Sequence, residues 1–115
     1  MQKIVIFAFN GDPMYFIHVL LNLVNLAERG IEAKLVLEGA STKFVPELVS
    51  EKSMFYKLFK KAWEKGLIAG VCKACAQKMG TLDLAKQNNF PILDDMSGHA
   101  GMANFITQGY TVITL

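Results

Sequence analysis

Five short apolar runs recur along the chain, and segments with the pattern of a helix separate most of them. The first run, "KIVIFAF" at residues 3–9, has almost no polar alternation, which is typical of a strand buried on both faces of a sheet. Further strands are predicted at residues 32–39, 67–71, 90–96 and 110–115. Such strands, alternating with helices, form a parallel sheet covered on both faces. The sequence therefore predicts an α/β fold, a three-layer α/β/α sandwich around a five-stranded parallel sheet.

The helices between these strands are predicted at residues 13–29, 46–65, 72–80 and 97–109, and residues 46–65 fit either one helix or two pieces that meet near residues 50–53. Residues 81–89 fit either a further turn of helix or a loop. Asp12 can cap the first helix, and Pro13 suits its first turn. That helix is apolar except for one narrow stripe of polar residues, formed by His18, Asn22, Asn25 and Arg29. One sheet face covers only about half of a helix, so we expect unusual burial or a subunit contact along its flank.

Composition places the chain among compact globular proteins. The 115 residues are 52% hydrophobic and 19% charged, which suits one domain over residues 1–115 whose core needs no disulfide or metal. The net charge is only +2, and the lysines at residues 57–65 alternate with apolar residues as on a solvated helix face, so nucleic acid is not an expected partner. No signal peptide or membrane-spanning stretch is recognised, so we expect a cytoplasmic protein without a membrane partner.

Three loops are expected at the carboxyl edge of the sheet, where open parallel sheets bind ligands. They are "NGDP" after the first strand, "VCKAC" after the third and "DDMSGHAG" after the fourth. Their polar residues can converge although they are far apart in the sequence. The candidate substrate-binding residues are Asn10, Gly11, Lys73 and His99.

The two cysteines, Cys72 and Cys75, are the candidate catalytic residues. Cys72 follows the third strand at the start of a helix, where amide groups and the helix dipole lower the pKa of a thiol below its usual value. Two alternatives stay open. The cysteines can be packed core residues, or they can form a redox pair as in thioredoxin. Zinc needs four ligands, whereas the chain offers one CxxC and two scattered histidines, so neither a metal site nor a cofactor is expected.

Nearly the whole chain resembles the DsrE/DsrF/TusD-like family of small sulfur-relay proteins. The segments that carry this resemblance are "KIVIFAFNGDP", "VCKACAQKMG" and "ANFITQGYTVITL", and the most specific feature is a cysteine eight residues before a glycine, met by Cys72 and Gly80. The resemblance implies the strand order 2-1-3-4-5 and a homo-oligomer of three or six subunits. It also implies that Cys72 carries a persulfide between partner proteins.

Two functional hypotheses follow. In the first, the protein is a sulfurtransferase-like sulfur relay: Cys72 accepts a sulfane sulfur from a donor protein and passes it to an acceptor protein, and Cys75 resolves or protects the persulfide. In the second, it is a non-catalytic oligomeric binding or scaffold protein in which both cysteines are packed.

Overall fold

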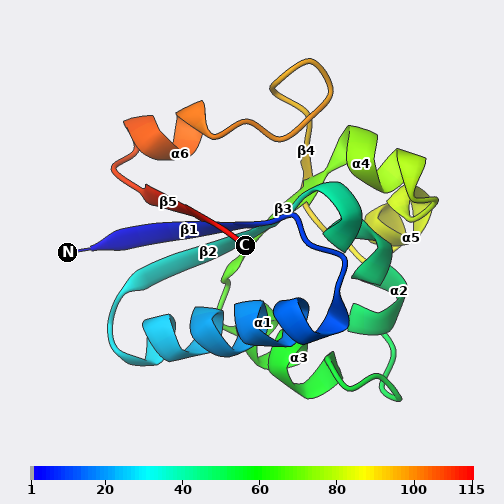
Figure 1. Cartoon of the computed structure of the whole chain (residues 1–115), viewed down its shortest axis with the longest axis horizontal. Helices are drawn as coiled ribbons and strands as arrows, with labels where there is room; N and C mark the ends of the chain where they lie inside the picture. The colour runs from blue at the N-terminus through cyan, green and yellow to red at the C-terminus, as the bar shows by residue number, and fades with distance from the viewer. Residues whose placement is uncertain (1) are drawn as a thin grey trace.

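The computed structural model describes residues 2–115 and shows an α/β fold around a five-stranded, all-parallel sheet (Figure 1). This confirms the predicted fold class and the parallel sheet. The strands, in chain order, are β1 (Lys3–Ala8), β2 (Glu32–Leu37), β3 (Ile68–Cys72), β4 (Ile92–Leu93) and β5 (Thr111–Thr114).

The predicted strand order, 2-1-3-4-5, is wrong, because the sheet has the order β4-β3-β2-β1-β5. In particular β2 lies between β1 and β3: its Leu37 is opposite Ala8 on one side and Val71 on the other. The physical reason is that each of the first three connections leads to the neighbouring strand, as sequential strands in α/β folds usually do. Only the last connection crosses back over the sheet, to place β5 beside β1.

These connections decide which face each helix covers. The helices α1 (Pro13–Glu28) and α3 (Tyr56–Glu64) lie on one face of the sheet, and α6 (Ala103–Thr107) lies on the other (Figure 1). Crossovers between parallel strands are right-handed. Connections that run in the same direction across the sheet therefore place their helices on one face, and a connection that runs back places its helix on the opposite face. The short helices α2 (Val45–Leu48), α4 (Lys73–Lys78) and α5 (Leu82–Gln87) lie toward the carboxyl end of the sheet (Figure 1).

The two faces of the sheet have separate cores. Under α1 and α3, Ile6 and Leu35 pack with a group of aromatic rings formed by Phe16, Phe44 and Phe55. Under α6, the core is smaller and consists of Val5, Phe7, Val36, Cys72, Ala100 and Tyr110. One of the two cysteines is therefore part of a hydrophobic core.

The first helix begins as predicted, since Asp12 Oδ1 accepts a hydrogen bond of 2.9 Å from the amide of Met14 and Pro13 is the first helical residue. Its flank is open in the single chain: Met14 is 69% exposed and Leu21 45% exposed. The predicted subunit contact along this flank stays a prediction. No helix within residues 2–115 has both the length and the apolar character needed to cross a membrane.

Several predicted boundaries need correction. Of the two alternatives for residues 46–65, the structure shows the two pieces, α2 and α3, with residues 49–55 between them. The predicted loop after β2 contains the 3-10 helix η1 (Gly39–Phe44). The fourth strand is only two residues long. The predicted helix at residues 97–109 begins only at Ala103, because Ser97 and Gly98 have positive φ angles of 50° and 89° and close a turn that no helix can contain.

Candidate functional site

Four side chains with chemically reactive groups meet at the carboxyl edge of the sheet: Glu38, Cys72, Cys75 and His99. One sulfur, nitrogen or oxygen atom of each lies within 4.8 Å of those of the other three. The cluster lies beside the ends of β3 and β4, whose following segments lead to opposite faces of the sheet. Crevices of this kind are where open α/β sheets bind their ligands.

Cys72 ends β3 and is fully buried in the core under α6. Burial raises the pKa of its thiol from the ordinary value of 9.0 to about 12, although the backbone amides of Cys75 and Ala100 act in the opposite direction. The predicted lowering of this pKa is therefore wrong. The sequence shows the helix start beside the cysteine but not the hydrophobic layer that covers it.

The sequence suggested that the first amides of α4 are available to a thiolate, but one of them is already hydrogen-bonded. The amide of Ala74 donates a 3.0 Å hydrogen bond to the carbonyl of Gly98, which docks the turn after β4 onto the start of this helix. Lys73, a predicted binding residue, extends toward Asp94, with 4.0 Å between Nζ and Oδ2. The positive charge of Lys73 thus lies beside a carboxylate.

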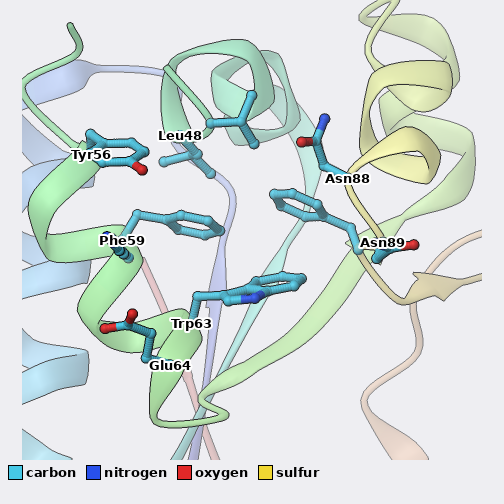
Figure 2. Close-up of a pocket in the computed structure, with 10 residues that line it drawn as sticks. Leu48, Tyr56, Phe59, Trp63, Glu64, Asn88 and Asn89 are labelled. Carbon is cyan, nitrogen blue, oxygen red and sulfur yellow. The ribbon is translucent and has the colours of Figure 1, made fainter. Parts of the chain in front are cut away.

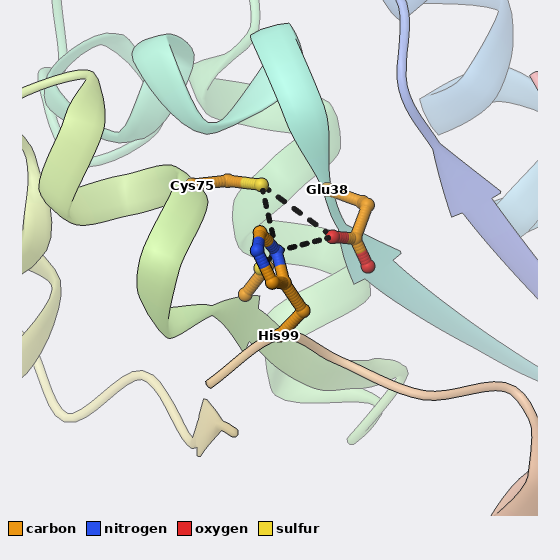
Figure 3. A group of neighbouring side chains, drawn as sticks. Glu38, Cys75 and His99 are labelled. Carbon is orange, nitrogen blue, oxygen red and sulfur yellow. Dashed lines mark hydrogen bonds and ion pairs between the residues drawn. The ribbon is translucent and has the colours of Figure 1, made fainter. Parts of the chain in front are cut away.

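Cys75 lies one turn along α4 and is only partly buried. Its thiol donates a hydrogen bond to Glu38 Oε1 at 3.5 Å, and its sulfur lies 3.6 Å from His99 Nδ1. Figure 3 shows Glu38, Cys75 and His99 turned toward one another. Of the two cysteines, Cys75 is thus the one that solvent can reach.

Glu38 follows β2 directly, and its side chain is only 6% exposed. Within residues 2–115 its Oε2 has no hydrogen-bond partner. The backbone at this point is held by Ser41, whose hydroxyl donates to the carbonyls of Ala8 and Glu38 at 2.6 and 2.9 Å. Glu38 was not predicted as a site residue, although one signal was present: it is an acidic residue at the carboxyl end of an apolar strand.

His99 enters the cluster from the turn after β4. Its amide and carbonyl exchange hydrogen bonds with Met96 at 2.9 and 2.8 Å, and its side chain is 45% exposed. Its Nδ1 lies 3.3 Å from Cys72 Sγ and 3.8 Å from Glu38 Oε1. The sequence predicted that His99 faces this edge, and the structure places it there, although in a turn rather than at a helix start.

Asn10 and Gly11 were predicted to join the cysteines, but β2 separates their strand from β3. Asn10 Oδ1 accepts a 2.8 Å hydrogen bond from the amide of Asp12 and so stabilises its own loop. Gly11 lies close to Ala40 and Lys43. The correct strand order puts Glu38, at the end of β2, in the place where the predicted order put the "NGDP" loop.

Among known proteins, the relatives found are archaeal. The chain is 30% identical over 98 residues to the uncharacterized protein MJ0733 of Methanocaldococcus jannaschii, a match that covers 85% of this chain and 78% of that protein. The chain belongs to the same family as MJ0733. It is also 44% identical over 59 residues to an uncharacterized protein of Archaeoglobus fulgidus, covering 51% of this chain and 95% of that protein. No family model and no solved structure matches it.

A hollow in the surface lies apart from this cluster, between α3 and the segment that leads into β4 (Figure 2). Its aromatic residues pack against one another. The ring centroids of Phe59 and Phe90, which are stacked, lie 5.5 Å apart, and those of Trp63 and Phe90 lie 5.2 Å apart. Neither cysteine lines this groove. Both thiols therefore lie at the carboxyl edge of the sheet and not in this groove.

Proposed function

We propose that this protein carries sulfane sulfur as a persulfide on Cys75, with Cys72 as the partner thiol. The observation that supports this choice is the contrast between the two sulfurs. Cys75 is partly exposed, and its thiol donates a hydrogen bond to the buried carboxylate of Glu38, whereas Cys72 is fully buried in the core. The predicted roles of the two cysteines are thus exchanged.

Loading begins with transfer of the Cys75 proton to Glu38, the acceptor of its hydrogen bond. The thiolate attacks the outer sulfur of a donor persulfide R–S–SH, the donor S–S bond breaks, and R–S⁻ leaves and takes up the proton. The balance is Cys75–SH + R–S–SH → Cys75–S–SH + R–SH. His99, which is half-exposed beside the sulfur, can pass the proton to the departing thiolate.

Delivery is a second exchange of the same kind. An acceptor thiolate attacks the outer sulfur of Cys75–S–SH, forms its own persulfide and leaves Cys75 as a thiol. The competing internal step is attack by Cys72 on the inner sulfur, which forms the Cys72–Cys75 disulfide and releases hydrogen sulfide. That step needs the Cys72 thiolate, and burial raises the pKa of Cys72 to about 12, so the internal discharge is slow. The stored sulfur is thereby kept for an external acceptor.

The resemblance to sulfur-relay proteins supports the same function. On this proposal the partners are a sulfur donor protein and an acceptor protein in the cytoplasm, and the chain assembles into a trimer or hexamer through apolar surface such as the open flank of α1. Light scattering of the purified protein measures the subunit number directly. A monomeric mass would remove the assembly from the proposal and leave the thiol chemistry unaffected.

Trypsin offers a sharp test of the persulfide position, because it cleaves after Lys73 and so separates the cysteines into a peptide 66–73 with Cys72 and a peptide 74–78 with Cys75. Reduced, chelator-treated protein is incubated with a persulfide donor, alkylated and digested. We expect the mass of one added sulfur on peptide 74–78. The variant Cys75→Ser should accept none, and Lys52→Ala, at an exposed position, should load normally.

The second candidate function, a binding or scaffold protein with packed cysteines, is favoured by one observation, the complete burial of Cys72. The exposure of Cys75 opposes it. If neither peptide gains sulfur while Cys75 still reacts with an alkylating reagent, the sulfur-carrier proposal is wrong and the scaffold function is preferred.

A further inference from the structure

We propose that Glu38, Cys72, Cys75 and His99 form a binding site for one divalent transition-metal ion, with Zn²⁺ as the preferred ion. This inference goes beyond sulfur transfer. It uses the same two thiols, so bound metal and persulfide compete for the site.

The distances within the cluster fit a tetrahedral zinc site. Zinc bonds of about 2.3 Å to sulfur and about 2.0–2.2 Å to nitrogen and oxygen put the ligand atoms of a tetrahedron about 3.3–3.8 Å apart. The His99 Nδ1 atom lies 3.3 and 3.6 Å from the sulfurs of Cys72 and Cys75. Glu38 Oε1 lies 3.5 Å from the Cys75 sulfur and 3.8 Å from His99 Nδ1. Four of the six separations among the ligand atoms lie in this range, and all six are within 4.8 Å, as expected of atoms that surround one small ion.

The ligand types indicate which ion fits. Two thiols, one imidazole and one carboxylate form a soft to borderline donor set, which suits Zn²⁺ and disfavours Mg²⁺ and Ca²⁺, whose ligands are oxygen atoms. With four ligands from the protein, the tetrahedral coordination is complete. We therefore infer a closed site that holds its metal, rather than one with a free position for a water nucleophile.

The buried charge of Glu38 is the independent observation that points to a cation. A carboxylate that is almost fully buried, with one oxygen unpaired within residues 2–115, is costly unless a positive charge or further donors compensate it. The neighbours within reach are two thiols and an imidazole, none of which carries a fixed positive charge. A divalent ion supplies this charge and stabilises both thiolates.

Neighbouring groups also fix the positions of the ligands, as they usually do around a metal. The backbone amides of Cys75 and Ala100 act to stabilise the thiolate form of Cys72, the form that binds a metal. Ser41 fixes the backbone of Glu38, and the bridge to Met96 fixes that of His99. Because β2, β3, α4 and the turn after β4 each contribute to the site, the fold arranges these ligands before any metal arrives.

Titration with Co²⁺, a spectroscopic substitute for Zn²⁺, tests the site directly. The protein is reduced, freed of metal with a chelator and kept without oxygen. We expect the intense visible bands of tetrahedral Co²⁺ and a near-ultraviolet thiolate-to-cobalt band, both saturating at one ion per chain and both lost when Zn²⁺ is added. Weak octahedral bands, or no saturation near one ion, overturn the proposal on the wild-type protein alone.

Single variants then identify the ligands. We expect His99→Ala and Glu38→Gln each to weaken Co²⁺ binding at least about 10-fold, and Cys75→Ser to reduce the thiolate band. His18→Ala and Glu47→Ala, at exposed positions outside the cluster, are the matched controls and should bind as the wild type does. Unchanged binding in His99→Ala and Glu38→Gln would contradict the proposed ligand set. Sulfur loading is measured without metal, so either property can fail while the other stands.

Discussion

At the scale of single residues, the two cysteines lie only three positions apart in the chain but have opposite surroundings. Cys72 belongs to the buried core cluster that also contains Val5, Phe7 and Ala100, whereas Cys75 on α4 is only partly buried. The reactivity of a cysteine depends on its access to solvent and on its thiolate fraction. Burial denies Cys72 the first and, by raising the pKa of its thiol, lowers the second. The CxxC spacing alone indicates neither the solvent access nor the thiolate fraction of a cysteine.

This contrast predicts selective alkylation. Near neutral pH, we expect iodoacetamide to modify Cys75 at least about 100-fold faster than Cys72, because Cys72 is fully buried and burial raises the pKa of its thiol to about 12. The two tryptic peptides report each cysteine separately. In denaturant the difference should disappear, which is the internal control. Equal rates in the native protein would contradict the burial of Cys72.

The same burial predicts a loss of stability in alkaline solution. The pKa of Cys72 is about 12 in the folded protein against an ordinary value of 9.0, so between these values the unfolded chain has lost the proton and the folded one keeps it. The free energy of unfolding should then fall as pH rises, by at most about 1.4 kcal/mol per pH unit for each such group. Urea unfolding of metal-free protein between about pH 8 and pH 11 measures this slope.

Tyr110 adds to the same slope, since burial, together with Glu32, raises its pKa from 10.0 to about 12. The variant Cys72→Ala should therefore show a smaller slope from about pH 9 upward, and Tyr110→Phe a smaller slope only from about pH 10 upward. An unchanged slope in Cys72→Ala would show that its thiol titrates normally.

At the scale of helices and strands, the sequence predicted the kinds of element well and the order of the strands badly. Apolar runs and helix caps are local signals, so β1, α1 and the cap at Asp12 were predicted correctly. Strand order depends on the lengths and directions of connections, and the order implied by the resemblance placed the end of β1 beside β3. That single error explains why Asn10 was expected in the site and Glu38 was missed.

The pairing of β3 with β4 depends on Gly70, which predicts a strong effect of one added methyl group. A Cβ at this residue would lie 2.6 Å from the carbonyl oxygen of Pro91 and 2.8 Å from Leu93, and its φ of +151° is unfavourable for other residues. We expect Gly70→Ala to lower the free energy of unfolding by about 3 kcal/mol. Because β4 leads into the turn with His99, Co²⁺ binding should weaken as well.

Gly66→Ala is the matched control for Gly70→Ala. Gly66 has a φ of +73° but nothing within 4 Å of an added Cβ, so it shares the backbone strain without the collision. We expect a cost of about 1 kcal/mol. Equal costs for the two variants, measured by urea unfolding, would show that the contact with Pro91 does not matter.

At the scale of the whole molecule, the cluster joins segments that are far apart in the chain. Glu38 comes from the end of β2, the cysteines from β3 and α4, and His99 from the turn before α6. An ion bound by all four therefore links the end of β2, the start of α4 and the turn after β4. An ion that binds the folded chain alone must stabilise it against unfolding.

Zinc should accordingly raise the unfolding temperature. At a free Zn²⁺ concentration 100 times the Kd, the added free energy is about 2.7 kcal/mol, which for a chain of this length corresponds to roughly 10 °C. The shift should shrink strongly in His99→Ala and persist in His18→Ala, and Mg²⁺ should cause none.

Amide exchange gives the location: residues 94–102, which lie mostly outside helices and strands, should gain the most protection because the ion fixes their turn to α4. Zinc that stabilised the protein without protecting this turn would have to bind elsewhere.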